Sequence, residues 1–380
     1  MENAGEPRFA AAPSSRRGKG RKPGVNGGAN SNGRAKPVPA PARGNNRYSG
    51  DDGRSDYRPT YAALDLGTNN CRLLIARPQG QDFVIVDAFS RIVRLGEGLI
   101  ESGRIGEAAM ARAIEALKVC AEKLRRRRVH LSRAVATEAC RRAENGAEFI
   151  ARVRDETGIL LDIISAKEEA RLAVLGCHQL LDDGPGPALI FDIGGGSTEL
   201  VLLGDGVDDP VILDWQSIPW GVVSLTESER HDSEDSTARA AAYAAMRERV
   251  RIAIQSFGAR VADRVNGGPL RLLGTSGTVT TLASLYLDLP AYDRAQVDGL
   301  TVASQDMRAV CARLADMAVS ERERLACVGR ERADLVVSGC AILEEIIDIW
   351  PAQTLNVADR GIREGVLRQL MRQHAAVTPA

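Results

Sequence analysis

Two glycine-rich turns carry the residues of this sequence that could bind phosphate. Each turn follows an aspartate at the end of an apolar run: Asp65 precedes "LGTNN", and Asp192 precedes "IGGGSTE". Glycine allows positive φ and lets an anion approach backbone N–H groups, and small hydroxyl side chains add donors. We therefore predict phosphate contacts from both turns, at Gly67, Thr68, Asn69, Gly194, Gly195, Gly196, Ser197 and Thr198. A simple hairpin turn is an equal alternative for "GTN" alone, but three consecutive glycines exceed what a hairpin needs.

The two aspartates call for a different chemistry. A carboxylate does not bind phosphate directly, so Asp65 and Asp192 are expected to hold Mg²⁺, or a water that bridges to the phosphate.

A third loop, "LLGTSGTVTTL", lies between a predicted strand and a predicted helix and places Ser276 and Gly277 at the helix N-terminus, where backbone donors suit an anion. The paired turns are the stronger signal, because glycine and serine are ordinary strand-to-helix connectors.

The elements around these turns repeat. Apolar runs at 61–66, 71–77 and 82–89 predict three strands, followed by a helix at 107–124, a strand at 133–137 and a helix at 146–156. From residue 187 the same order restarts: strand, glycine turn, strand, strand, helix, strand, helix. We predict an α/β protein with two mixed sheets flanked by helices and a ligand cleft between them, with domains at 59–178 and 179–380.

Composition separates a tail from these domains. Residues 1–58 carry twelve Lys or Arg against five Asp or Glu and are dominated by Gly, Pro, Ala, Asn and Ser, which predicts a disordered basic tail. Such a tail solubilises the chain or, alternatively, touches a polyanion. No run of eighteen apolar residues occurs, so no membrane association is expected, nor is binding to a specific nucleic acid. Seven cysteines without C-x-x-C spacing favour a reducing, cytoplasmic location.

Six motifs in this order resemble the exopolyphosphatase and guanosine pentaphosphate phosphohydrolase family. They are "YAALDLGTNNCRLLIA", "AVATEACRRAENGAEF", "IISAKEEARLAVLG", "LIFDIGGGSTELVLL", "LLGTSGTVTTL" and "RADLVVSGCAILEEI". The resemblance covers roughly residues 61–370. It implies two actin-like, ribonuclease H-like domains of the superfold that includes sugar kinases, heat-shock ATPases and actin. It also implies Mg²⁺-dependent hydrolysis of a terminal phosphoanhydride, in inorganic polyphosphate or at the 5′ end of guanosine pentaphosphate (pppGpp).

The resemblance also implies roles for single residues. Ser165 and Glu168 match a capping box, which gives Glu168 a structural role and leaves Glu169 as the implied catalytic base. Arg141 matches an arginine that family members use against phosphate, and Glu199 matches an acid near the metal. Glu138 is a weaker candidate, because other members carry different residues there.

Departures from the family pattern bear on the substrate. Longer members append a C-terminal helical domain with a His-Asp metal signature, which is not found after "NVADRGIREGVL", so processive grip on long polyphosphate would need another source. We expect a homodimer. The function that we expect is that of an exopolyphosphatase. The alternatives to it are a pppGpp phosphohydrolase, a sugar-kinase-like ATPase, and a non-catalytic sensor of polyphosphate or guanosine tetraphosphate.

Overall fold

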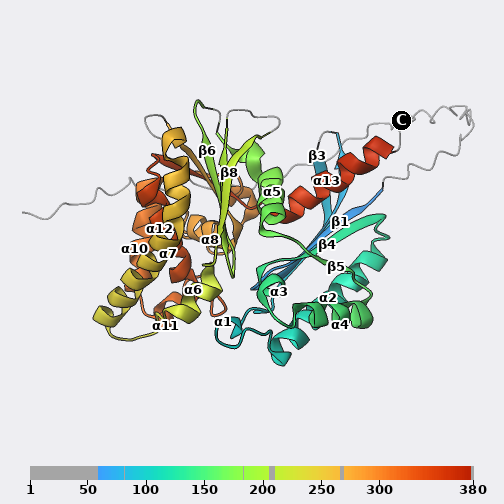
Figure 1. The fold of residues 1–380 in the computed structure, drawn as a ribbon, viewed down its shortest axis with the longest axis horizontal. Helices are drawn as coiled ribbons and strands as arrows, with labels where there is room; N and C mark the ends of the chain where they lie inside the picture. The colour runs from blue at the N-terminus through green and yellow to red at the C-terminus, as the bar shows by residue number, and fades with distance from the viewer. Residues whose placement is uncertain (1–58, 81, 183, 205–209, 266–268, 378–380) are drawn as a thin grey trace, which may run out of the picture. The chain divides into compact units, whose positions relative to one another are not determined.

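A computed structural model describes residues 59–80, 82–182, 184–204, 210–265 and 269–377 of the chain. The predicted basic tail, residues 1–58, lies outside the described residues. The described part contains two mixed β-sheets with helices packed against them (Figure 1). This confirms the predicted α/β class and the duplicated arrangement.

The first sheet has the strand order β3-β2-β1-β4-β5. Its strands are β1 (Tyr61–Leu66), β2 (Asn70–Gln79), β3 (Asp82–Ile92), β4 (Leu131–Ala136) and β5 (Leu161–Ile163). The first three form an antiparallel meander, because short turns join them, while β4 and β5 return parallel to β1 through helical crossovers. The crossovers contain α1 (Leu99–Ser102), α2 (Glu107–Arg126), α3 (Glu138–Arg142) and α4 (Gly146–Thr157).

The second sheet repeats this order, with one added edge strand. Read from that edge it is β10-β11-β9-β6-β7-β8. Its strands are β6 (Ala188–Ile193), β7 (Thr198–Leu203), β8 (Ile212–Ile218), β9 (Arg271–Thr275), β10 (Thr301–Ala303) and β11 (Thr354–Ala358). Its helices are α6 (Val222–Ser228), α7 (Ser236–Val265), α8 (Ser276–Tyr286), α9 (Arg294–Val297), α10 (Ser304–Asp316), α11 (Val319–Arg322) and α12 (Val336–Ile349). β6, β7, β8, β9 and β11 correspond to β1, β2, β3, β4 and β5.

The last helix of each repeat packs on the sheet of the other repeat. Helix α5 (Ala166–Cys177) follows β5 but buries Ala170, Val174 and Cys177 against the second sheet. Helix α13 (Ile362–Val377) follows β11 but buries Val366 and Leu367 against the first sheet, and Figure 1 shows it beside β1 and β3. The predicted domain boundary between residues 178 and 179 remains a prediction. α13 follows this boundary in the sequence but packs on the first sheet.

Glycines allow α5 and α13 to touch where they cross. A Cβ atom on Gly365 would lie 2.0 Å from the Leu172 carbonyl oxygen, and one on Gly176 would lie 2.0 Å from the Gly361 carbonyl oxygen. No side chain fits at those distances, so the two backbones are in direct contact. This crossing ties the two sheets together.

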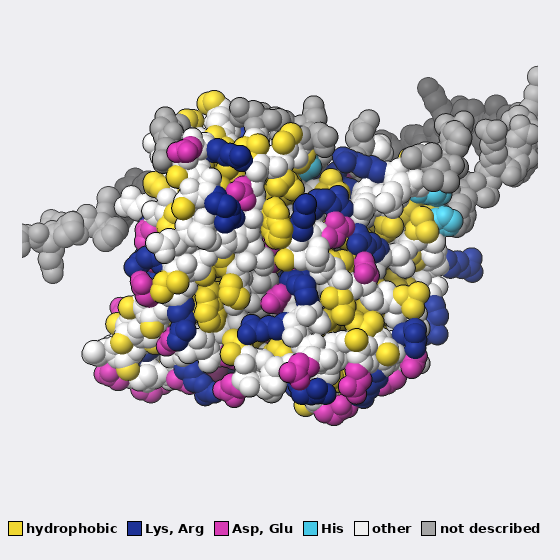
Figure 2. Space-filling model, in the orientation of Figure 1, with side chains coloured by type: hydrophobic (Ala, Val, Ile, Leu, Met, Phe, Trp, Pro, Cys, Tyr) yellow, Lys and Arg dark blue, Asp and Glu magenta, His cyan; other side chains and the backbone are white. Residues whose placement is uncertain are grey.

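The surface is of mixed charge, and no described helix is long and apolar enough for a bilayer crossing. Figure 2 shows basic and acidic side chains interspersed on the face in view. This agrees with a chain that has 50 Lys and Arg and 50 Asp and Glu.

Candidate active site

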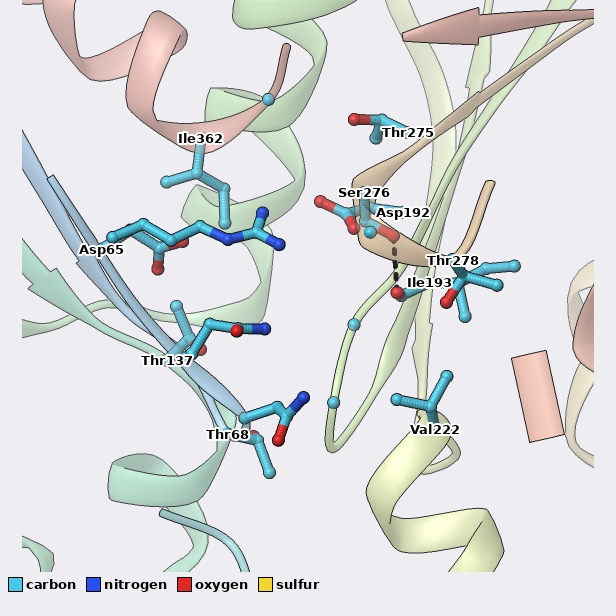
Figure 3. Close-up of a pocket in the computed structure, with 18 of the residues that line it drawn as sticks. Asp65, Thr68, Thr137, Asp192, Ile193, Val222, Thr275, Ser276, Thr278 and Ile362 are labelled. Carbon is cyan, nitrogen blue, oxygen red and sulfur yellow. Dashed lines mark hydrogen bonds between the residues drawn. The ribbon is translucent and has the colours of Figure 1, made fainter. Parts of the chain in front are cut away.

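A cleft of about 130 Å³ brings the three predicted phosphate-binding loops together. Its walls come from the β1–β2 turn, the β6–β7 turn, the start of α8 and residues 359–363, which lead into and begin α13. In Figure 3 Asp65 and Thr68 project from one side, and Asp192 and Ser276 face them from the other. Glu138 and Glu169 also line the cleft, while Thr198 and Arg141 are not among its lining residues.

Both turns hold their carbonyl groups away from the cleft. In the first, the Asn69 carbonyl accepts from the N–H of Val93 (2.8 Å) and Arg94 (3.0 Å), and the Thr68 carbonyl accepts from the N–H of Gly96 (2.9 Å). A peptide whose carbonyl is fixed on one side presents its N–H to the other. The β3–α1 loop therefore orients the first turn.

The N-terminus of α6 does the same for the second turn. The Gly194 carbonyl accepts from Val222 N–H (2.9 Å), and the Gly195 carbonyl accepts from Val223 N–H (2.8 Å). The sequence did not predict that α6 and the β3–α1 loop orient the two turns. The available signal was a glycine after the third strand of each repeat, in "RLGEGL" and "PWGVVSL".

Not every predicted backbone donor is free. The N–H of Gly67 donates to the Asn70 carbonyl (2.9 Å), and the N–H of Gly194 donates to the Ser197 carbonyl (3.0 Å), so these two groups close the turns. The following N–H groups make no hydrogen bond to another described residue; they belong to Thr68, Asn69, Gly195 and Gly196. These four donors remain for an anion, and the Ser197 N–H, which also makes no hydrogen bond to another described residue, joins them. Ser276 and Gly277, at the N-terminus of α8, line the same cleft.

The glycines are needed for close approach and not for positive φ, which corrects the expectation from sequence. None of the glycines in the two turns has φ in the left-handed region. A Cβ atom on Gly195 would lie 2.9 Å from Thr68 Cβ and 3.0 Å from the Asn69 nitrogen. The two turns therefore touch each other across the cleft, and a side chain would separate them.

Three of the predicted hydroxyl donors are used within the protein. Ser197 Oγ donates to Glu199 (2.7 Å), and Thr198 Oγ1 donates to the Trp220 carbonyl (2.7 Å). Ser276 Oγ donates to the Ile193 carbonyl (2.6 Å), the bond drawn in Figure 3. Ser276 also has φ of 88°, a strained value for a residue with a side chain. These hydroxyls position the loops, and backbone N–H groups are left to face the cleft.

Buried carboxylates crowd the same cleft. Burial and the nearby charge of Asp65 raise the pKa of Asp192 to about 6. Burial and the charge of Asp192 raise the pKa of Glu199 to about 7, although Ser197 and Ser217 donate hydrogen bonds to it. Burial likewise raises the pKa of Asp65. A cation between these groups would favour their ionised forms.

The oxygen atoms around Asp65 suit a hard divalent cation. Asp65 Oδ1, Asn69 Oδ1 and Asn70 Oδ1 are buried and have no hydrogen-bond partner among the described residues. The three predicted metal ligands, Asp65, Asp192 and Glu199, do not form a single cluster: within the described residues no three His, Cys, Asp or Glu side chains are close enough to hold one ion. Mg²⁺ usually binds one or two carboxylates and completes its shell with water and phosphate oxygens, so this partial oxygen set fits it.

Glu169 lies in the first turn of α5 with its side chain in the cleft wall. Ser165 Oγ accepts from the Glu168 N–H (3.2 Å) as predicted, but the Glu168 carboxylate pairs with Arg133 and Arg171, so only half of the capping box forms. Glu169 is buried, and its Oε2 accepts from Arg141 Nη1 at 3.0 Å. Burial and the charge of Glu199 raise the pKa of Glu169 well above its usual range, although Arg141 lowers it.

Four arginines in the cleft were missed from the sequence: Arg72, Arg332, Arg360 and Arg363. Burial lowers the pKa of Arg72, and the charges of Arg363 and Arg332 lower it further, as expected for clustered cations. Arg72 pairs across the β1–β2 hairpin with Asp65, and Glu199 occupies the same position opposite Asp192 in the second hairpin. The signal was an arginine inside an otherwise apolar strand, seven residues after the aspartate, where the second repeat has Glu199.

Known proteins share this sequence and architecture. The sequence pattern of the Ppx/GppA phosphatase family matches residues 74–374 of this chain. The chain is 34% identical to exopolyphosphatase 2 of Mycobacterium tuberculosis, over 81% of this chain and 98% of that protein. Among solved structures, a Ppx/GppA family member from Aquifex aeolicus matches with 28% identity and a TM-score of 0.67, over 83% of this chain and 98% of that one. An exopolyphosphatase from Cytophaga hutchinsonii matches with 26% identity and a TM-score of 0.73, over the same shares. The chain belongs to the Ppx/GppA phosphatase family.

Proposed function

We propose that the protein is a Mg²⁺-dependent exopolyphosphatase, which removes the terminal phosphoryl group of inorganic polyphosphate by attack of water. The observation that carries this proposal is the convergence of two glycine turns, with their carbonyls tied back and their N–H groups free, beside a buried glutamate. Similarity to exopolyphosphatases of two organisms supports the choice of substrate.

The turns and the arginines would divide the binding of the polyanion between them. The N–H groups of Thr68, Asn69, Gly195 and Gly196 would hold the terminal phosphoryl oxygens, because oriented backbone donors stabilise charge without reorganisation. The arginines at 72, 332 and 363 would bind the phosphates further along the chain, where a guanidinium can make two parallel bonds to one group.

Glu169 would act as the base. Its carboxylate would orient the attacking water and accept its proton, while Arg141 holds the carboxylate in place through the 3.0 Å bond. Asp65 and Asp192, with Asn69 Oδ1 and Asn70 Oδ1, would hold Mg²⁺, and Glu199 would complete the acidic side of the site. The bound ion would supply positive charge to the phosphoryl oxygens during transfer.

A second candidate substrate is pppGpp. Leu335 and Val336 line the cleft near Arg332, and an apolar surface beside a cation suits a nucleobase with phosphates attached. Homodimer formation and a cytoplasmic location remain predictions.

Phosphate release from polyphosphate and from pppGpp, measured side by side with Mg²⁺, tests the proposal. We expect faster release from polyphosphate. Preference for pppGpp would favour the second candidate, and binding without release from either would favour a sensor. Transfer from ATP to a hexose, tested in parallel, would indicate a sugar kinase.

A further inference from the structure

Glu138, which lines the cleft, holds the guanidinium of Arg141, which does not line it. Glu138 Oε2 accepts from Arg141 Nη2 at 2.6 Å and from Arg141 Nε at 3.1 Å. The remaining nitrogen, Nη1, donates to Glu169 Oε2 (3.0 Å) and to the Ile164 carbonyl (2.8 Å). Arg141 therefore donates hydrogen bonds to two carboxylates and one carbonyl group. Glu138 covers the edge of the guanidinium that is formed by Nε and Nη2.

Glu138 reaches this position from the N-terminus of α3, directly opposite the second glycine turn. A Cβ atom on Gly196 would lie 2.9 Å from Glu138 Cγ and 2.7 Å from Thr68 Oγ1. The Glu138 side chain thus lies close to Gly196 of the second turn and lines a cavity with Thr68 of the first. It lies beside the N–H groups that would hold the terminal phosphoryl group in the proposed function.

A carboxylate and a phosphoryl group offer a guanidinium the same acceptors. Both bring oxygen atoms that carry negative charge, and both form paired bonds with the Nε–Nη2 edge. We propose that the Glu138 carboxylate occupies the place of a phosphoryl oxygen on Arg141, and that the terminal phosphoryl group of the substrate displaces it. This inference rests on the proposed function and makes Glu138 a residue that sets substrate affinity.

One oxygen of the displaced carboxylate can enter a cavity beside the cleft. This second cavity, of about 10 Å³, adjoins the cleft and shares Thr68, Glu138 and Gly196 with it. That volume accommodates about one water-sized oxygen. Arg142 lines this cavity and forms no ion pair with another described residue, so it can receive the carboxylate, although Glu227 in the same wall opposes it.

Displacement costs binding energy, so removing the charge of Glu138 should tighten binding. For Glu138→Gln we expect a KM for polyphosphate and a dissociation constant for inorganic tripolyphosphate about threefold to tenfold lower than in the wild type. For Arg142→Gln we expect both constants to rise about threefold, because the displaced carboxylate loses its partner. A merely structural role for Glu138 predicts no gain in affinity.

The matched control is Glu168→Gln. Glu168 pairs with Arg171 at the same i, i+3 spacing, 2.7 Å apart, but does not line the cleft, so both constants should stay at the wild-type values. Titration calorimetry with tripolyphosphate at fixed Mg²⁺, on full-length folded protein, measures affinity without turnover. Weaker or unchanged tripolyphosphate binding by folded Glu138→Gln would overturn the inference. Absence of phosphate release by the wild type would instead reject the proposed function while leaving the binding comparison readable.

Discussion

Glu168 and Glu169 are consecutive residues of α5 with opposite surroundings. Glu168 accepts from Arg133 and Arg171 near the surface, and these bonds lower its pKa. Glu169 is buried in the cleft, and its pKa is raised by burial and by Glu199. One residue step along a helix turns the side chain by about 100°, which separates a structural glutamate from a catalytic candidate.

Replacing Glu169 tests its role as the base. Glu169→Gln keeps the side-chain shape but cannot accept a proton, so we expect kcat for phosphate release to fall by about 10²- to 10⁴-fold with the fold intact. Stopped assays of phosphate release, with circular dichroism of each variant, measure this. Glu168→Gln is the control and should retain activity within about threefold. Wild-type turnover by folded Glu169→Gln would show that another group accepts the proton.

The acid cluster predicts a pH-dependent response to Mg²⁺. The folded-state pKa values of Asp192 and Glu199 are raised to about 6 and about 7, so the metal-free folded protein binds more protons than the unfolded chain above about pH 4. Its stability should therefore fall as pH rises from about 4 to about 7. Mg²⁺ binds the ionised groups, so the increase in Tm on adding Mg²⁺ should be larger at pH 8 than at pH 5. An equal increase at both pH values, measured by scanning calorimetry, would contradict a cation site at these carboxylates.

Residue types in the sequence predicted which side chains line the cleft. They did not predict which hydrogen bonds those side chains make. Asp65 and Asp192 lie in one cleft, as the paired turns predicted, and Glu169, which the family resemblance implied, lines the same cleft. The hydroxyls of Ser197, Thr198 and Ser276 could not be assigned from sequence, because their acceptors come from distant segments or depend on side-chain rotation. Arg72 was missed because an arginine in an apolar strand carries no motif of its own.

At the scale of elements, the two turns work as a pair. Each has its carbonyls fixed by the segment that follows the third strand of its repeat: the β3–α1 loop and the start of α6. The turns then meet at Gly195, which approaches Thr68 and Asn69 too closely for a side chain. Strand runs and turns were predictable from apolar periodicity, whereas the short α6 was not, because it has too few residues for a periodic pattern.

A side chain at Gly195 should separate the turns. In Gly195→Ala the added Cβ would lie 3.0 Å from the backbone nitrogen of Asn69, which cannot move aside as a side chain can. We expect kcat/KM for polyphosphate to fall at least about tenfold, with smaller changes in stability. Gly184→Ala is the matched control, because its Cβ would meet only Arg271 Cδ, at 3.5 Å. Full activity of Gly195→Ala would mean that contact between the turns is not needed.

At the scale of the whole described molecule, the exchange of α5 and α13 couples the two sheets. α5 contributes to one core cluster of the second sheet and α13 to one core cluster of the first, so each sheet loses part of its core when the other unfolds. Apolar periodicity predicts helices beginning at residues 167 and 361, but it does not predict their exchange. The apolar stripe of a helix shows that it packs against something, and does not specify which sheet.

This coupling predicts a single unfolding transition. Trp215 and Trp350 belong to or pack against the second sheet, so their fluorescence reports on that half, while circular dichroism reports on both. Urea curves from the two probes should coincide in the wild type.

A side chain at the crossing should weaken both halves together. Gly365→Ala places a Cβ 2.0 Å from the Leu172 carbonyl, and we expect a loss of at least about 2 kcal/mol in the free energy of unfolding. Gly258→Ala, inside α7 with its nearest neighbour at 3.7 Å, should be neutral or stabilising by up to about 1 kcal/mol. Separate transitions for the two probes in the wild type would argue against the coupling.

The central claim is that both glycine turns bind the same terminal phosphoryl group. A crystal structure with Mg²⁺ and a non-hydrolysable, methylene-bridged triphosphate tests it most directly. We predict one phosphoryl group within hydrogen-bond distance of N–H groups from both turns, at 68–69 and 195–196, with Glu169 beside it. A triphosphate bound outside the cleft, or held by one turn alone, would contradict the account.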